Sequence, residues 1–302
     1  MPGRQTRELI ELTPQPSVAA ALLAGVEHGP IDLERLIRLI EADPALTVRV
    51  LRHANSIQHG APRRVASVPH AMSLLGSQTV TSLVMAAAVA SLDAVGPTGP
   101  PGHWRHSLVT AVCAGAIASE LSVPPAEAHA AGLLHDVGTL LLFQQSPDRL
   151  AECQREGPMA RVLSAEINAF GVSHTMIGAS TLEHWCFPAA LIEAVACHHG
   201  ADEPHHQVGR IVRVAEVIAL SMQADPNHHT EIEPESAMAM VRLSHGRLPS
   251  IKRRVEARLH DIARLLSVRP VPAADPDTSA DPNAAADLGT GTSVDGPGGE
   301  PS

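Results

Sequence analysis

The chain has 302 residues, of which 44% are hydrophobic and 18% are charged, a balance typical of a globular protein with a sizeable buried core. No apolar run reaches the roughly 20 residues of a membrane span, and the N-terminus lacks a hydrophobic signal segment. Six of the ten net negative charges lie after Arg269, and no basic stripe with interleaved aromatic residues is present. We therefore expect a cytoplasmic protein with no membrane or nucleic-acid partner.

Residues 1–95 show the spacing of several short amphipathic helices, with leucine and isoleucine recurring at helical intervals. Asp43-Pro44 predicts a helix start, because aspartate is a good N-cap and proline fits the first helical position. Gly76 is placed where a helix would end, before the apolar stretch 80–92. This part of the chain is expected to form an N-terminal multi-helix subdomain.

The run 96–102 is rich in proline and glycine and predicts a linker. Helical patterning resumes over 103–268, and no segment shows the period-two alternation of a strand. Residues 269–302 are rich in Pro, Gly, Ala, Asp and Ser and have almost nothing to bury, so we expect a disordered acidic tail. The pattern as a whole predicts an all-α protein.

The chain contains 18 histidines, and most can be set aside because they lie in polar loop sequence, lack partner acids at ligand spacing or lie beside an acidic neighbour on a predicted helix. His135 and Asp136 differ, because they lie in the segment 130–138, predicted as a helix that is apolar on nearly every side. A buried carboxylate is costly unless it is paired or bound to a cation. Asp136 could satisfy this requirement by pairing with a histidine or by accepting backbone N–H groups.

Further histidines and a glutamate occupy the apolar sides of neighbouring predicted helices. Together with the His135–Asp136 pair, the candidate metal ligands are His106, His135, Asp136, His174, His198, His199 and Glu216. Ligands contributed singly by several helices are typical of metal sites in helical bundles. Imidazole and carboxylate suit one or two divalent ions such as Fe, Mn, Zn or Ni, and the lack of cysteine ligands argues against a closed structural zinc site.

Each of these residues alone has an ordinary structural explanation. A single buried histidine is usually a hydrogen-bonded core residue, and Glu216 could pair with Arg213 one helical turn away. The metal hypothesis therefore depends on the group and not on any one member.

The order and spacing of several short motifs resemble the HDOD (HD-related output domain) family of bacterial signalling modules. The motifs are Asp43-Pro44-Ala45-Leu46-Thr47, Arg52-His53-Ala54-Asn55-Ser56, the segment 67–76, Trp104-Arg105-His106-Ser107, the segment 132–138, His184-Trp185-Cys186-Phe187-Pro188 and His198-His199. The resemblance begins near Leu12 and extends to about Leu220. It implies an N-terminal helical subdomain packed on an HD-type helical bundle.

The resemblance also implies a function in signal transduction, exerted through a protein partner or a small nucleotide ligand. The related HD-GYP enzymes hydrolyse cyclic-di-GMP, and their ligand pattern falls on the seven residues named above. Three differences weaken the inference of catalysis: Thr139 stands where active HD-GYP enzymes carry a lysine, no Gly-Tyr-Pro signature follows His199, and Glu216 replaces an aspartate.

Three hypotheses follow. The first is a regulatory domain whose His/Asp pocket binds a ligand or a metal without a full catalytic apparatus. The second is a metal-dependent phosphohydrolase acting on a nucleotide or cyclic dinucleotide. The third is a metal that serves only to stabilise the fold.

Overall fold

The computed structural model describes residues 12–27, 32–57, 64–91, 96–199, 203–223 and 232–267. Within these ranges it contains helices and no strand, which confirms the predicted all-α class. The chain divides into the units Met1–Val268 and Arg269–Ser302, and every described residue belongs to the first. The predicted disordered tail, 269–302, lies outside the described residues.

The N-terminal part consists of short helices whose ends follow the predicted signals. They are α1 (Pro16–Glu27), α2 (Leu33–Ile40), α3 (Pro44–Ile57), α4 (Val68–Leu75) and α5 (Ser77–Ser91). Asp43 precedes α3, and its Oδ1 accepts the Leu46 N–H at 2.9 Å, as expected of an N-cap. Gly76 ends α4 with a φ of +80°, a backbone conformation that favours glycine.

The chain between α5 and α6 contains no helix in its described residues, 96–102, where the linker was predicted. The helices that follow are α6 (His103–Ala118), α7 (Pro125–Leu134), α8 (Val137–Gln145), α9 (Pro147–Gln154), α10 (Met159–Phe170), α11 (His174–His184), α12 (Ala189–Cys197) and α13 (Gln207–Gln223). The division of the chain into subdomains at this linker stays a prediction.

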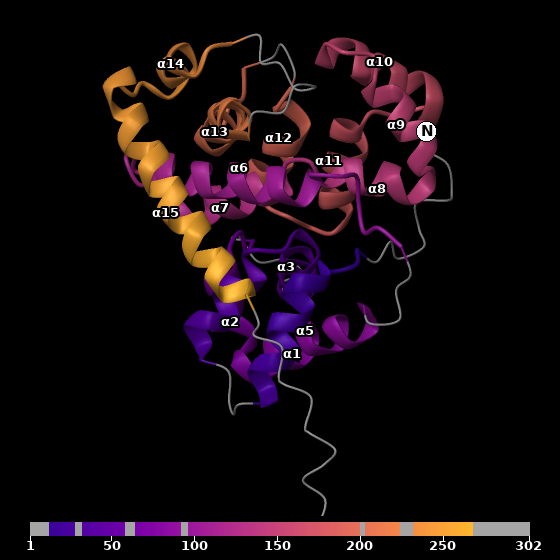
Figure 1. Ribbon diagram of the computed structural model, residues 1–302, viewed down its shortest axis with the longest axis vertical. Coiled ribbons are helices and arrows are strands. Elements are labelled where there is room, and N and C mark those ends of the chain that lie inside the picture. Colours follow the sequence, from indigo (N-terminus) through magenta and orange to yellow (C-terminus); the bar gives the residue numbers. More distant parts are fainter. Residues whose placement is uncertain are drawn as a thin grey trace, which may run out of the picture. The chain divides into compact units, whose positions relative to one another are not determined.

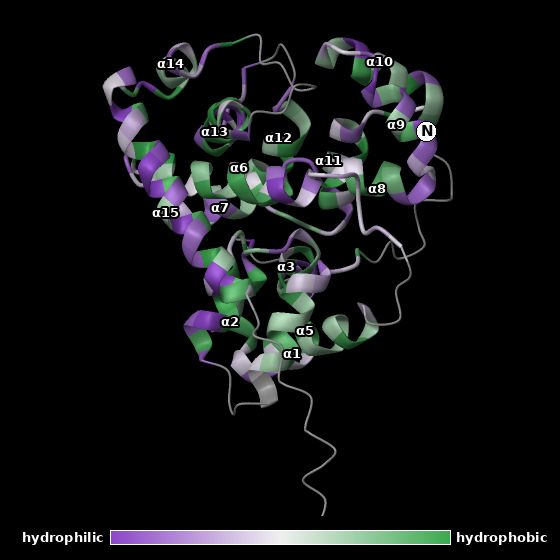
Figure 2. Cartoon of the chain, viewed as in Figure 1, coloured by the Kyte–Doolittle hydropathy of each residue, from purple (hydrophilic) through white to green (hydrophobic). Residues whose placement is uncertain are grey.

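The C-terminal part of the described chain returns toward the N-terminal helices. It comprises α14 (Pro234–Ala237), the 3₁₀ turns η2 (Met238–Val241) and η3 (His245–Arg247), and the long helix α15 (Leu248–Leu266). Helix α15 runs past α6 and also contacts α1 and α2 (Figure 1). Its residues are largely hydrophilic, with apolar ones at intervals (Figure 2), and Ile251, Val255 and Ile262 are buried against the neighbouring helices.

Two hydrophobic cores hold these helices together. One contains Leu22 and Leu46 from the N-terminal helices together with Leu134, Leu141 and Val195 from α7, α8 and α12. The N-terminal helices therefore share a core with the helices that carry the candidate ligands. The second core joins α6, α13, η2 and α15. Burial of this apolar surface is the main favourable contribution to folding.

No single helix in the described part of the chain is long and apolar enough to cross a membrane. Helices α4 and α5 satisfy the length and composition test only as a pair, and they are bent by 116° at Gly76. Val80 and Val84 of α5 lie in the core of the unit.

Candidate metal centre

His135 and Asp136 lie at a break between two helices. Helix α7 ends at Leu134, α8 begins at Val137, and Asp136 has the non-helical angles φ −111° and ψ 25°. The prediction of one continuous helix over 130–138 was therefore wrong. His135 at this break is buried, and the side chain of Asp136 is 15% exposed.

Two glycines explain why this break is so closely packed. A Cβ at Gly138 would lie 1.8 Å from the carbonyl oxygen of His174, and a Cβ at Gly178 would lie 3.1 Å from the Gly138 nitrogen. Helices α8 and α11 can therefore approach at this point only because neither position carries a side chain. The close approach places His174, the first residue of α11, beside Asp136.

His135 and His198 are oriented in the same way. Each follows the last residue of a helix, and its Nδ1 hydrogen-bonds a carbonyl oxygen three residues earlier: Gly132 at 2.7 Å for His135, and Val195 at 2.8 Å for His198. With Nδ1–H as the donor, Nε2 carries the lone pair. The buried Nε2 of His198 has no hydrogen-bond partner among the described residues.

His174 is held by a glutamate that the sequence analysis did not identify. The carboxylate of Glu166 lies 2.8 Å from Nδ1 of His174 and also accepts the His174 backbone N–H at 2.8 Å. Nε2 of His174 has no hydrogen-bond partner within the described chain and lies 3.8 Å from Oδ1 of Asp136. Glu166 is only 1% exposed, so it acts as a fixed support for this imidazole.

The structure brings all seven predicted residues together. They lie on α6, the α7–α8 break, α11, the end of α12 and α13, and Figure 1 shows where these helices lie. Nε2 of His106 lies 3.2 Å from Nε2 of His135, and Nε2 of His199 lies 3.4 Å from Oε1 of Glu216. Stacked or edge contacts connect His135 to His198 and His198 to His174 and His199.

We call these seven residues the histidine cluster. Within it, two groups of three residues could each hold an ion. Every residue of a group offers one ligand atom, and the three atoms lie within 4.8 Å of one another. One group is His174, His198 and His199, and the other is His106, His135 and Glu216. Asp136 belongs to neither group but contacts His174 of the first. The arrangement is that of two adjacent three-residue sites.

Burial controls the charge of the cluster. It lowers the pKa of His135 and of His198 to about 3, and neighbouring histidines lower both further. For Asp136, burial acts upward, but the adjacent His103 and the charge of His174 outweigh it and hold the pKa well below its usual range. Burial and the nearby Asp136 raise the pKa of Glu216 well above its ordinary value. At neutral pH, His135, His198 and Asp136 therefore present free lone pairs.

The residues present fit a divalent metal ion. Ligation requires neutral imidazole and ionised carboxylate, which His135, His198 and Asp136 provide at neutral pH. His174 and Glu216, whose pKa values are raised, would release a proton when an ion binds. Two buried imidazole nitrogens have no partner in the described chain, which is unfavourable. The Nδ1 hydrogen bonds to backbone carbonyls and to Glu166 are the kind that orient metal-binding histidines. The side chains of Asp136 and His199 are 15% and 14% exposed, so solvent reaches the cluster from that side.

Sequence reasoning also missed His103 and the contact made by Thr139. Nδ1 of His103 lies 3.3 Å from Oδ2 of Asp136, and the Thr139 hydroxyl donates to Oδ1 of the same carboxylate at 2.5 Å. The one available signal for His103 was its spacing, since it lies one helical turn before His106 on α6. Nothing in the sequence around Glu166 distinguishes it from an exposed helical glutamate.

A family model for the HDOD domain matches residues 12–201 of the chain. This chain belongs to the HDOD family. The match begins at the residue where the predicted resemblance begins, and the resemblance is thereby confirmed. Its predicted extension to about Leu220 goes beyond the matched residues.

Curated relatives match only parts of longer proteins. An uncharacterized protein of Treponema pallidum is 24% identical over 196 residues, which are 63% of this chain and 37% of that protein. Ribonuclease Y of Thermosipho melanesiensis is 32% identical over 115 residues, which are 38% of this chain and 18% of that enzyme. This HDOD chain thus spans well under half of either relative.

Solved structures match over most of the chain. The MmoQ response regulator of Methylococcus capsulatus is 27% identical, with a TM-score of 0.66, over 85% of this chain and 98% of that one. A virulence factor of Campylobacter jejuni has the same fold at 19% identity, with a TM-score of 0.61, over 84% of this chain and 97% of that one.

Proposed function

We propose that this HDOD protein is a signal-transduction output domain whose histidine cluster holds one or two divalent metal ions and acts by binding a ligand or partner. Membership of the HDOD family and the likeness to a response regulator support the signalling assignment. The observation that carries the metal assignment concerns the buried Nε2 atoms of His174 and His198, which have no hydrogen-bond partner among the described residues. They lie among five other ligand-type side chains.

His174, His198 and His199 would hold one ion, and His106, His135 and Glu216 the other, with Asp136 beside the first group. When bound, such an ion polarises phosphate oxygens and lowers the pKa of a bound water. Glu166 and the backbone carbonyls of Gly132 and Val195 fix which imidazole nitrogen faces the ion. His103 and Thr139 hold Asp136 in its ionised form.

Thr139 is the reason to propose binding and not rapid hydrolysis. Its side chain carries no positive charge, and its hydroxyl is engaged with Oδ1 of Asp136. It therefore cannot supply the cation that a lysine at this position provides in active relatives to stabilise developing negative charge. A signalling protein or a small nucleotide would then be bound at the cluster without fast turnover.

A metal-dependent phosphohydrolase is the second candidate, and the two adjacent ligand groups favour it. Two neighbouring ions are a common arrangement for phosphate-ester hydrolysis.

A turnover assay distinguishes the binding domain from the hydrolase. It uses cyclic-di-GMP and bis(p-nitrophenyl) phosphate as substrates and protein loaded with Mn²⁺ or Fe²⁺. We expect stoichiometric metal and turnover no faster than in the His135→Ala variant.

Metal content provides the internal control of the same experiment. His245→Ala removes an exposed histidine outside the cluster and should leave the metal content unchanged. Turnover that is fast in the wild-type protein and absent in His135→Ala would establish the hydrolase instead. Metal content that is equally low in the wild-type protein and in His135→Ala would contradict both candidates.

A further inference from the structure

Four arginines gather between α2 and α15, away from the histidine cluster. Arg35 and Arg38 of α2 and Arg258 and Arg264 of α15 line a cavity of about 490 Å³, and Asp261 is the one acidic residue in its lining. We call this cavity the arginine pocket. Its lining carries a formal charge of +3, and bringing like charges together in this way is unfavourable unless an anion compensates.

The arginines of this pocket have few internal partners. Arg38 pairs with Glu34 at 2.7 Å, but Glu34 is 76% exposed, so the pair is weak. The side chains of Arg35, Arg258 and Arg264 make no hydrogen bond or ion pair with the residues that the structure describes. The Nε atoms of Arg35 and Arg38 are buried and without an acceptor in the same part of the chain.

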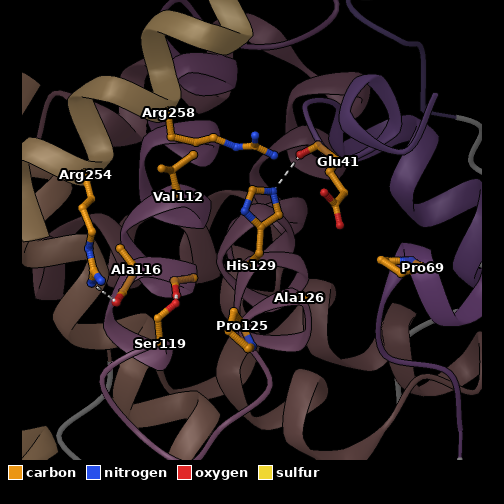
Figure 3. A pocket seen from close by; sticks show the side chains of 11 residues that line it. Glu41, Pro69, Val112, Ala116, Ser119, Pro125, Ala126, His129, Arg254 and Arg258 are labelled. Atoms are coloured by element: carbon orange, nitrogen blue, oxygen red, sulfur yellow. Dashed lines mark hydrogen bonds between the residues drawn. The ribbon is translucent and has the colours of Figure 1, made fainter. Parts of the chain in front are cut away.

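Arg258 also lines a second cavity, of about 460 Å³ (Figure 3). Its floor is apolar and includes Pro69, Val112 and Ala116. Figure 3 shows the Arg258 side chain extending across this cavity toward Glu41. We call this cavity the apolar cavity.

Apart from the Glu41 carboxylate, the other polar side chains that line the apolar cavity are already engaged. Arg254 donates to the Ala116 carbonyl at 2.6 Å and pairs with Glu120 at 2.9 Å. Nε2 of His129 lies 2.8 Å from the Glu41 carbonyl oxygen (Figure 3). Among the described residues, Arg258 is thus the cation of this cavity that is left for a ligand.

The two cavities are neighbours along one face of α15. Arg254, Arg258, Asp261 and Leu265 recur at helical spacing, and Arg258 lines both cavities. The combination is an apolar compartment joined to a strongly cationic one. Each volume lies within the roughly 300–1,000 Å³ typical of small-molecule sites.

We propose that these two cavities bind a nucleoside triphosphate, with its phosphates in the arginine pocket and its base and ribose in the apolar cavity. Arginine guanidinium groups match phosphate oxygens in a bidentate geometry and remain charged at all physiological pH values. A base is a flat, largely apolar group that suits the apolar cavity. This site is separate from the histidine cluster and does not depend on a metal there.

Isothermal titration of the full chain with ATP, GTP, guanosine and inorganic tripolyphosphate tests the proposal. We expect at least one nucleoside triphosphate to bind with a Kd below about 1 mM, and guanosine and tripolyphosphate to bind more weakly. Arg35→Gln combined with Arg264→Gln should weaken binding by about tenfold or more, because charge-assisted contacts to phosphate are lost.

The matched control combines Arg155→Gln with Arg161→Gln, two exposed arginines outside both cavities, and removes the same charge. The control should bind the nucleotide as the wild-type protein does, and His135→Ala, which alters the histidine cluster, shows whether binding occurs there instead. Arg258→Gln alone provides a second variant should the double substitution fail to fold. Binding that is lost in His135→Ala but kept in both pocket variants would overturn the proposal, as would tripolyphosphate binding as tightly as the nucleotide.

Discussion

Two groups of buried polar side chains, one at the α2–α3 junction and one in the histidine cluster, differ in whether their hydrogen bonds are made within the described chain. At the junction, Asp43 is 1% exposed, and its two oxygens accept the backbone N–H groups of Gln15 at 2.7 Å and Leu46 at 2.9 Å. In the cluster, the Nε2 atoms of His174 and His198 are buried without a hydrogen-bond partner in the described chain.

This difference separates a structural polar group from a binding group. The Asp43 carboxylate satisfies two N–H donors that the helix start and the N-terminal segment would otherwise leave unpaired, so it stabilises the fold by itself. The cluster leaves two buried imidazole nitrogen atoms without a hydrogen-bond partner in the described chain, which costs stability unless something from outside binds. The following experiments probe the histidine cluster and the α2–α3 junction.

Acidification should have the largest effect. The pKa values of His135 and His198 are about 3 in the folded protein, against 6.5 ordinarily. The folded state favours the neutral form of both histidines, and this contribution to the free energy of unfolding is fully present above pH 6.5. It is lost as the pH falls from 6.5 toward 3, because the unfolded chain binds the protons first, at up to about 1.4 kcal/mol per pH unit for each group. Urea unfolding of metal-free protein between pH 7 and 4 measures this loss, and His135→Gln should make it shallower.

Asp43 should act in the opposite direction over part of the same range. Burial raises its pKa to about 6, against 3.8 ordinarily, although its backbone hydrogen bonds oppose the shift. Its contribution to stability therefore grows as the pH falls from 6 toward 3.8 and offsets part of the loss from the histidines. Asp43→Asn should make the acid-induced loss of stability steeper. If the pH dependence of the free energy of unfolding were the same as in the wild-type protein for both His135→Gln and Asp43→Asn, neither group would contribute as described.

Removal of the metal should have the next largest effect. An ion present at about 100 times its Kd stabilises the folded state by about 2.7 kcal/mol. We expect EDTA to lower the melting temperature of the wild-type protein and of Asp43→Asn by the same amount, and to leave His198→Ala unchanged. Differential scanning calorimetry with and without chelator measures this, and an equal shift in His198→Ala would show that the ion binds elsewhere.

Glu166→Gln should have a smaller and more specific effect. Glutamine keeps the size of the side chain and one acceptor for Nδ1 of His174, but the negative charge that supports this imidazole is lost. Loss of such a supporting partner typically weakens metal binding about 10- to 100-fold. Titration with Mn²⁺ should show this in Glu166→Gln and not in the control Glu152→Gln, whose carboxylate is exposed. Equal Mn²⁺ affinities in Glu166→Gln and Glu152→Gln would show that Glu166 does not support metal binding.

The α2–α3 junction should show the smallest effect. Asp43→Ala removes the N-cap of α3, which typically costs about 1 kcal/mol, whereas asparagine is an equally good cap. Denaturant unfolding at pH 8 should therefore show a larger loss in Asp43→Ala than in Asp43→Asn, which keeps one of the two acceptor oxygens. Metal content should be unchanged in both, since the junction contributes nothing to the cluster.

Local signals were enough to predict some elements of the fold. Asp43-Pro44 and Gly76 marked helix ends correctly because capping and positive φ are properties of a few consecutive residues. The seven cluster residues came from apolar patterning combined with the resemblance to a family, and the structure brings them together. Whether they bind a metal stays a prediction.

Other features depend on contacts between distant segments and were not predictable. The segment 130–138 has helical patterning throughout, yet its helix breaks at His135–Asp136, close to the point where Gly138 packs against His174 of another helix. Glu166 becomes a partner of His174 only because the turn between α10 and α11 brings the two together. The hydrophobic periodicity of α10 and α11 gives no indication of the contact between Glu166 and His174.

The central claim is that the histidine cluster is a divalent metal site. It is tested most directly by a crystal structure of the protein purified with Mn²⁺, with diffraction data collected at the manganese absorption edge. The account predicts an anomalous peak within about 2.0–2.3 Å of the Nε2 atoms of His174 and His198. A map with no peak among His106, His135, Asp136, His174, His198, His199 and Glu216 would contradict it.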